Sequence, residues 1–126
     1  MAHQQTELVE IRQTKTKGRG VFARTFIPKG TIIERVPVIV VTWDQIDESE
    51  LAHYAYSWTE TKAAIALGYG SLYNHSFRPN AYYEDVGRQT KVFTAFRDIQ
   101  PGEEVTINYN GDPKDKTNEL GFDVLD

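Results

Sequence analysis

The chain has 126 residues, a length typical of one domain that can bury a hydrophobic core of its own. It contains no cysteine, which excludes disulfides and cysteine-ligated zinc and is typical of a reducing compartment. The formal net charge is -4, from 14 Lys and Arg against 18 Asp and Glu, which argues against a nucleic-acid-binding surface and is compatible with a basic protein or peptide as partner.

The first third of the sequence is typical of short strands separated by glycine turns. We predict strands over 8–13, 21–25 and 31–41, with turns at 17–20 and 27–30. Pro37 has no N–H for a sheet ladder, so it should divide the last of these strands into two or place it at a sheet edge.

The middle of the sequence mixes helix and strand signals. Thr42 and Gln45 have the spacing of a capping box, which predicts a short helix over 43–52. Alternation over 54–58 predicts a strand. The segment 61–74 is alanine-rich and then broken by glycines, which predicts a turn or two of helix that enters an irregular loop.

The last third predicts a hairpin and a further strand. The segments 81–86 and 91–96 flank a glycine and should pair as the hairpin. The segment 103–109 alternates, with Val105, Ile107 and Tyr109 on one face. The remaining tail is polar apart from Phe122, Val124 and Leu125.

Two segments of the chain resemble each other at a constant offset. The residues 23–33 ("ARTFIPKGTII") align with 95–105 ("AFRDIQPGEEV"), so that Ile27 matches Ile99 and Gly30 matches Gly102. Two copies are too few for a solenoid. We interpret them as two similar hairpin corners in one small β fold.

Residues 71–83 ("SLYNHSFRPNAYY") place polar side chains among large aromatic ones, and such groups must be hydrogen-bonded if they are buried. Asn74-His75-Ser76 matches a glycosylation acceptor, but the chain has no secretory signal. No histidine pair has zinc-motif spacing, so we expect no metal site. A serine hydrolase is unsupported, because no serine stands in a G-x-S-x-G turn.

Four blocks occur in a recognisable order: "GRGVFA", "YAY", "GYGSLYNHSFRPN" and "GEEVTINYNGD". In this order they resemble the SET-domain family of protein lysine methyltransferases, and above all the minimal stand-alone SET proteins of viruses and prokaryotes. The resemblance covers about residues 8–112. It implies a single mainly β domain of short twisted sheets with a pseudoknot and little helix, followed by a short tail over 113–126.

The resemblance also implies a site for S-adenosylmethionine. Backbone groups of Gly18, Arg19 and Gly20 would hold its methionine part. The backbone around Asn74 and His75 would bond the adenine, the Asn74 side chain would reach the methionine end, and Asn80 would pin the crossing. The chain lacks the zinc-binding segment that closes the channel in larger relatives, so Phe122 is our candidate for covering adenine and channel, a core or tail aromatic being the alternative.

The same resemblance places Tyr109 at the methyl-transfer centre. A phenol with a pKa near 10 can direct a hydroxyl at the reacting groups and stay neutral at pH 7. The lysine channel would have aromatic walls, with Tyr54 in it and Tyr69 as its neighbour. Ile107 stands where the family uses phenylalanine or tyrosine to set the number of methyl groups. Because isoleucine has no hydroxyl, it favours more than one methylation.

We therefore predict a protein-lysine N-methyltransferase that acts on a histone-like or other basic protein. A non-catalytic SET-fold module that binds a basic peptide is the alternative, and a non-protein amine also stays open as substrate. The polar N-terminus and the absence of an apolar run of ~20 residues predict neither signal peptide nor membrane span. We expect a cytoplasmic protein, or a nuclear one in a eukaryotic host, without direct nucleic-acid binding. A homodimer stays open.

Overall fold

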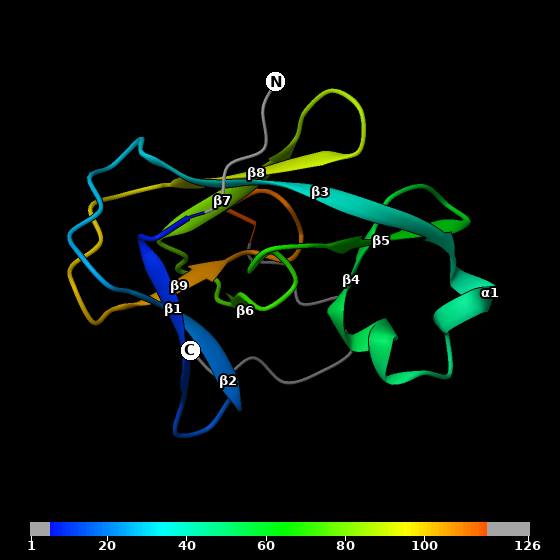
Figure 1. Cartoon of the computed structure of the whole chain (residues 1–126), viewed down its shortest axis with the longest axis horizontal. Coiled ribbons are helices and arrows are strands. Elements are labelled where there is room, and N and C mark those ends of the chain that lie inside the picture. The colour runs from blue at the N-terminus through cyan, green and yellow to red at the C-terminus, as the bar shows by residue number, and fades with distance from the viewer. Residues whose placement is uncertain (1–5, 116–126) are drawn as a thin grey trace.

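The computed structural model describes residues 6–115, which fold mainly into strands arranged in two sheets. The strands are β1 (Val9–Gln13), β2 (Arg19–Ala23), β3 (Ile32–Thr42), β4 (Ala55–Ser57), β5 (Lys62–Ala66), β6 (Asn74–His75), β7 (Ala81–Asp85), β8 (Thr90–Ala95) and β9 (Glu104–Ile107). One sheet has the order β1-β2-β9-β6 and the other β4-β5-β3-β8-β7. Figure 1 shows β3 and β8 crossing the molecule, with β4, β5 and the helix α1 (Trp43–Ile46) at one end.

The strand β3 is continuous and central, so the prediction that Pro37 would divide it or place it at an edge was wrong. Residues 32–37 pair with β8 and residues 38–42 pair with β5. The N and O atoms of one residue in a strand point to the same side. The Pro37 carbonyl accepts from Leu67 N at 3.1 Å, one residue beyond the end of β5. The proline nitrogen therefore faces a side where the ladder has already ended.

Residues 62–66 form the strand β5, where the alanine-rich sequence predicted a helical turn. This strand lies between β4 and β3. Its residues Ala63, Ala64 and Ala66 are all buried. The space between the neighbouring layers admits only small side chains there, and a Cβ on Gly70 would already lie 2.6 Å from Ala66 Cβ. Tertiary packing thus overrides the helix propensity of alanine.

The helical region is shorter than predicted. The helix α1 spans a single turn, and a 3-10 helix, η1 (Glu50–Tyr54), follows it. The start of α1 agrees with the capping-box spacing, since Thr42 N donates to Gln45 Oε1 at 3.0 Å. Tyr54 ends η1 and β4 begins at the next residue. In residues 6–115 no helix reaches the length and apolar character that crossing a bilayer requires.

The two segments related by an offset of 72 residues pair with each other. Ile27 and Ile99 exchange both backbone hydrogen bonds, at 2.9 and 2.8 Å. Gly30 N donates to Ala95 O at 2.9 Å, and the matching Gly102 N donates to Ala23 O at 2.8 Å. Both glycines have positive φ, 87° and 85°. The repeated sequence therefore forms two equivalent corners that contact each other around a local twofold axis.

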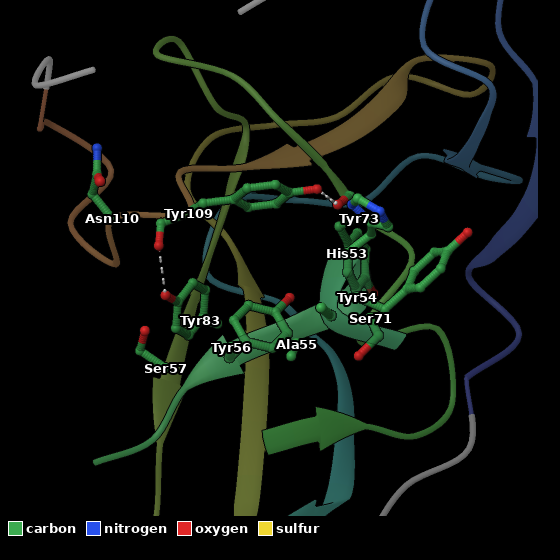
Figure 2. Close-up of a pocket in the computed structure, with 11 residues that line it drawn as sticks. His53, Tyr54, Ala55, Tyr56, Ser57, Ser71, Tyr73, Tyr83, Tyr109 and Asn110 are labelled. Carbon is green, nitrogen blue, oxygen red and sulfur yellow. Dashed lines mark hydrogen bonds between the residues drawn. The ribbon is translucent and has the colours of Figure 1, made fainter. Parts of the chain in front are cut away.

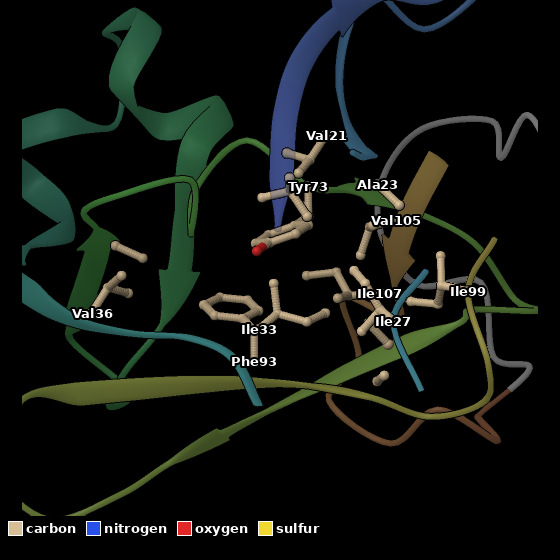
Figure 3. Packing of buried hydrophobic residues seen from close by; sticks show 14 of the residues in the cluster. Val21, Ala23, Ile27, Ile33, Val36, Tyr73, Phe93, Ile99, Val105 and Ile107 are labelled. Carbon is tan, nitrogen blue, oxygen red and sulfur yellow. The ribbon is translucent and has the colours of Figure 1, made fainter. Parts of the chain in front are cut away.

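The hydrophobic core lies between the two sheets. Val21 and Val105 come from the four-stranded sheet, and Ile33 and Phe93 come from the five-stranded one; all four are fully buried. Figure 3 shows these side chains gathered around Tyr73, whose ring stacks on Phe93 with centroids 4.7 Å apart. The core thus reaches directly to the segment around residue 73, which carries the strongest sequence motif.

Candidate active site

The segment after Tyr73 crosses the last strand. The short strand β6 runs parallel to β9, with Asn74 opposite Thr106 and His75 opposite Ile107. Ser76 N continues the contact by donating to Ile107 O at 2.9 Å. These bonds tie together two segments about thirty residues apart, as the pseudoknot arrangement requires.

Asn80 fastens this crossing with both ends of its side-chain amide. Its Nδ2 donates to Glu104 O at 2.8 Å, and its Oδ1 accepts from Thr106 N at 2.9 Å. The residue is 2% exposed. The donor and the acceptor of this buried amide are both bonded to backbone, as the N–H and C=O groups of a neighbouring strand would be. This agrees with the predicted pinning role.

His75 supports Tyr109, the second residue after the end of β9. Its Nδ1 accepts from Tyr109 N at 2.9 Å, so Nδ1 carries no proton. Its ring lies edge-on to Phe77, with centroids 4.6 Å apart, and 5.2 Å from the ring of Tyr109. The imidazole therefore orients the backbone at Tyr109.

Asn74 links the start of β2 to β9. Its Nδ2 donates to Arg19 O at 3.0 Å and to Glu104 Oε2 at 2.7 Å. Lys17 Nζ lies 3.6 Å from the other carboxylate oxygen, Glu104 Oε1. Sequence reasoning missed Glu104, which stands in the "GEEV" block and was interpreted only as part of the motif. Its charge holds the amide of Asn74 in place.

Tyr109 is held at three atoms. Its N is bonded to His75, its O accepts from Tyr83 Oη at 3.2 Å, and its own Oη donates to Tyr73 O at 2.6 Å. Figure 2 shows the two hydroxyl bonds on opposite sides of the residue. Burial, with a further contribution from the charge of Glu104, raises the pKa of Tyr109 to about 12. The phenol is therefore neutral throughout the physiological range.

Two pockets meet at this tyrosine. A pocket of about 630 Å³ and a smaller one of about 230 Å³ both have Tyr109 in their wall. Both are lined by His53, Tyr54, Ser71, Tyr73 and Tyr109. Lys17, Gly18, Arg19 and Asn74 line only the smaller pocket, and Tyr56, Ser57, Tyr83 and Asn110 only the larger. The site is therefore two compartments that share one wall.

The family comparison decides the identity of this fold. The family model described as "SET domain" matches residues 18–110, which is most of the chain. The chain belongs to the SET-domain family. The predicted family and the mainly β fold are thereby confirmed.

Proteins similar to this SET domain carry names that describe them as histone-lysine methyltransferases. The chain is 39% identical over 106 residues to a Schizosaccharomyces pombe "histone-lysine N-methyltransferase, H3 lysine-37 specific", covering 80% of this chain and 72% of that protein. It is 31% identical over 119 residues to the "H3 lysine-36 specific" enzyme of Cryptococcus neoformans, covering 82% of this chain but 14% of that longer protein. A crystal structure of a Plasmodium falciparum protein described as a histone methyltransferase matches with a TM-score of 0.70 and 32% identity, over 84% of this chain and 94% of that one.

The SET domain brings some of the predicted site residues together and not others. Gly18, Arg19, Asn74, Tyr54 and Tyr109 line the two pockets. His75, Tyr69 and Ile107 line neither pocket, and Ile107 is fully buried in the core. Gly20 lies behind the smaller pocket, against Asn74 and Glu104. Phe122 lies outside the described residues.

Three tyrosines of this site were missed by sequence reasoning. Tyr56, Tyr73 and Tyr83 line the larger pocket, from β4, the segment before β6, and β7. Tyr56 Oη donates to Gly70 O at 2.6 Å, and its ring meets that of Tyr83 edge-on at 5.0 Å. The only sequence signal was the abundance of tyrosine in these segments, and the pocket becomes visible only once the strands are paired. Among residues 6–115, no group of three or more His, Asp or Glu is placed to hold a metal ion.

A buried carboxylate lies beneath the site. Glu34 is 1% exposed and accepts from Tyr73 Oη and from Tyr69 N, the latter at 3.2 Å. Burial raises the pKa of Glu34 above its usual 4.5, against the opposing effect of these two hydrogen bonds. Glu34 thereby holds Tyr73, whose carbonyl receives the Tyr109 hydroxyl.

The raised pKa of Glu34 predicts a specific pH dependence of stability. Between 4.5 and the raised value, the unfolded chain releases a proton that the native protein retains, so the free energy of unfolding falls as pH rises. Glu34→Gln has no proton to release. Urea unfolding at pH 5 and pH 8 should therefore show a smaller fall in this variant than in the unsubstituted protein. Glu84→Gln, at an exposed position of β7, is the control and should keep the original fall; parallel curves for all three proteins would contradict the prediction.

Proposed function

We propose that this SET-domain protein is a protein-lysine N-methyltransferase that uses S-adenosylmethionine, with a lysine of a histone or histone-like protein as substrate. The observation that carries the proposal is the pair of pockets sharing Tyr109. A methyl donor and an acceptor amine must approach one another from two sides. The histone specificity in the names of the relatives supports the substrate class and, in a eukaryotic host, a nuclear location.

The smaller pocket fits the polar methionine end of S-adenosylmethionine. Its wall combines the turn at Gly18 and Arg19 with the Asn74 amide, which can offer backbone N–H groups and a side-chain carbonyl. Gly18 has φ of 72°, a conformation that glycine adopts without strain. When bound, S-adenosylmethionine would supply an electrophilic methyl group on a positively charged sulfur.

Tyr109 would orient the substrate amine. Its hydroxyl proton is engaged by Tyr73 O, so the phenol oxygen presents acceptor lone pairs to its other side. An amine N–H bonded to that oxygen is held in a fixed direction while the phenol stays neutral. Such positioning can contribute about 7–11 kcal/mol when the reactants are well aligned.

The larger pocket would hold the lysine side chain and favour its neutral form. A free lysine has a pKa near 10.4, so only about one molecule in two thousand is uncharged at pH 7. Tyrosine rings that exclude water disfavour the ammonium and lower that pKa. The described residues offer no carboxylate among those lining this pocket, so desolvation takes the place of a dedicated base.

The direct test is methyl transfer to histone H3. The protein is incubated with S-adenosylmethionine and recombinant histone H3, and the products are read by peptide mass spectrometry. A mass gain on a lysine of H3 supports the proposal, and di- or trimethyl-lysine would support the inference drawn from the isoleucine at position 107. A protein that binds H3 peptide and S-adenosylmethionine without transfer would be the non-catalytic module instead.

Gly20 provides a prediction about the cofactor site. A Cβ there would lie 2.5 Å from Glu104 Oε2 and 3.0 Å from Asn74 Nδ2, so Gly20→Ala must displace the bond between these two side chains. We expect weaker binding of S-adenosylmethionine by calorimetry and a loss of about 2 kcal/mol in stability, the size of a charged hydrogen bond. Gly87→Ala is the control: a Cβ there meets nothing within 4 Å, although its φ of 61° adds backbone strain. Equal cofactor affinity in both variants would contradict the prediction.

A further inference from the structure

Lys91 is a buried lysine for which the proposed reaction has no use. It lies on β8 and its side chain is 1% exposed. Its Nζ is 2.6 Å from Asp85 Oδ1, and the Asp85 side chain is 45% exposed. The positive end of this ion pair is thus inside the protein, and the negative end is partly in solvent. A buried ammonium is costly unless the surroundings stabilise it.

The stabilising surroundings are aromatic. The Nζ atom lies over the rings of Tyr56 and Tyr83, at 4.2 and 4.3 Å from their centroids, and 5.7 Å from that of Trp58. These distances are typical of cation–π contacts. Tyr56 and Tyr83 line the larger pocket, and Lys91 does not. The ammonium therefore lies behind these two tyrosine rings of that pocket.

We propose that Lys91 is a specificity-determining residue of the lysine pocket, which makes the pocket reject a second cation and accept a neutral amine. The inference rests on the proposed function, because it concerns the same pocket. Lys91 does not touch the substrate; it acts through Tyr56 and Tyr83, which it also holds in place. One of these, Tyr83, donates to the Tyr109 carbonyl.

The pocket would reject a second cation because the ammonium of Lys91 already lies over the rings of Tyr56 and Tyr83. A ring binds a cation through its negative face, and a cation already placed on that ring draws on the same electron density. A second positive charge in the pocket is also repelled directly through a medium that water does not screen well. Asp85 offsets this only in part, because its carboxylate is the more solvated member of the pair. Methyl transfer requires the neutral amine, so such a bias assists the reaction.

The titratable groups that face Lys91 come from β4 and β7. Asp85 and Tyr83 face it from β7 and Tyr56 faces it from β4, while its neighbour on β3 is the uncharged Val36. Burial lowers the pKa of Lys91, and Asp85 opposes that effect. Burial raises the pKa of Tyr83 to about 12 and that of Tyr56 well above 10. The surroundings of Lys91 Nζ are therefore neutral rings and one compensating carboxylate.

The test compares two small probes of nearly the same shape. Choline is a permanent cation, and 3,3-dimethylbutan-1-ol is its neutral counterpart. Both are titrated at pH 7 against the full chain labelled with ¹³C in its tyrosine rings, and the ratio of their affinities is read from the ring signals. We expect Lys91→Met to shift this ratio roughly fivefold towards choline, the size of a screened charge–charge interaction. Lys91→Arg, which keeps the charge and can stack on both rings, should retain the original ratio.

A structural role alone would weaken both probes together and leave their ratio unchanged. The proposal is overturned if the affinity ratio in Lys91→Met equals that of the unsubstituted protein. It is also overturned if Lys91→Met binds no choline detectably. If that variant does not fold, Lys91→Gln is measured instead and should shift the ratio towards choline as well; no shift overturns the proposal equally. Neither probe needs a methyl donor or the right protein substrate. An inactive protein with the expected ratios would therefore refute the proposed function and leave the role of Lys91 intact.

Discussion

Tyr109→Phe should abolish most methyl transfer while leaving the cofactor site intact. The substitution removes one oxygen atom, which accepts the substrate amine in the proposed mechanism and donates to Tyr73 O at 2.6 Å. Removing a single preorganised polar group at a reacting centre typically costs 10²–10³ in kcat. We expect a fall of about 100-fold or more in the rate of methyl transfer to histone H3, measured by mass spectrometry at saturating S-adenosylmethionine.

The structure limits the other effects of this change. The backbone bonds of Tyr109 to His75 and Tyr83 do not involve the hydroxyl, so the ring should stay in position. The loss in stability should be about 1 kcal/mol, the net value of one hydrogen bond. Tyr82→Phe is the matched control, because Tyr82 lies on β7 and lines neither of the two pockets at Tyr109. Similar rates for Tyr109→Phe and the unsubstituted protein would remove Tyr109 from the transfer centre.

The sequence motifs predicted the crossing of β6 and β9 better than any single strand boundary. The pinning role of Asn80 was implied by the resemblance to SET domains, and the aromatic run around it indicated only that a buried amide there requires partners. Its partners, the backbone of Glu104 and Thr106, lie in the other strong motif block. Because the two motif blocks bond to each other's backbone, their occurrence together in the sequence indicates the crossing even without a structure.

The contact between Tyr56 and Tyr83 could not be predicted in the same way. Tyr56 and Tyr83 are more than twenty residues apart, and each alone is an ordinary aromatic on an alternating strand. They meet at 5.0 Å only because β4 and β7 lie at opposite ends of a sheet that curls round to the site. The prediction of a helical turn where β5 lies was wrong for a related reason. Alanine favours helix locally, and only the packing between β3 and β4 requires a strand of small residues there.

The repeat at an offset of 72 residues was visible, but its meaning was not. The similarity of the two segments indicated two similar corners, and nothing in either segment specified that they would pair with each other. The mutual bonds between Ile27 and Ile99 depend on the positions of β2, β3 and β8 together. Local similarity thus predicts local conformation, whereas the contact between two copies is a property of the fold.

Asn74 and Asn80 should separate cofactor binding from stability. Asn74→Ala removes the amide that joins Arg19 O to Glu104 Oε2 in the wall of the smaller pocket. The residue is half-buried, so water can replace part of what is lost. We expect at least tenfold weaker binding of S-adenosylmethionine by calorimetry, equal to about 1.4 kcal/mol, with a smaller change in the free energy of unfolding.

Asn80→Ala should show the opposite pattern. It leaves Thr106 N and Glu104 O without their amide partner at a position that is 2% exposed, and each buried unsatisfied group costs about 1–3 kcal/mol. Its cofactor affinity, measured at a temperature where the variant is still folded, should stay close to the original because Asn80 lines neither of the two pockets at Tyr109. The reversed pattern, stable Asn80→Ala with lost binding, would mean that the smaller pocket is not the cofactor site. The two amides are six positions apart, so a difference of this kind would locate the cofactor site on the Asn74 side of the crossing.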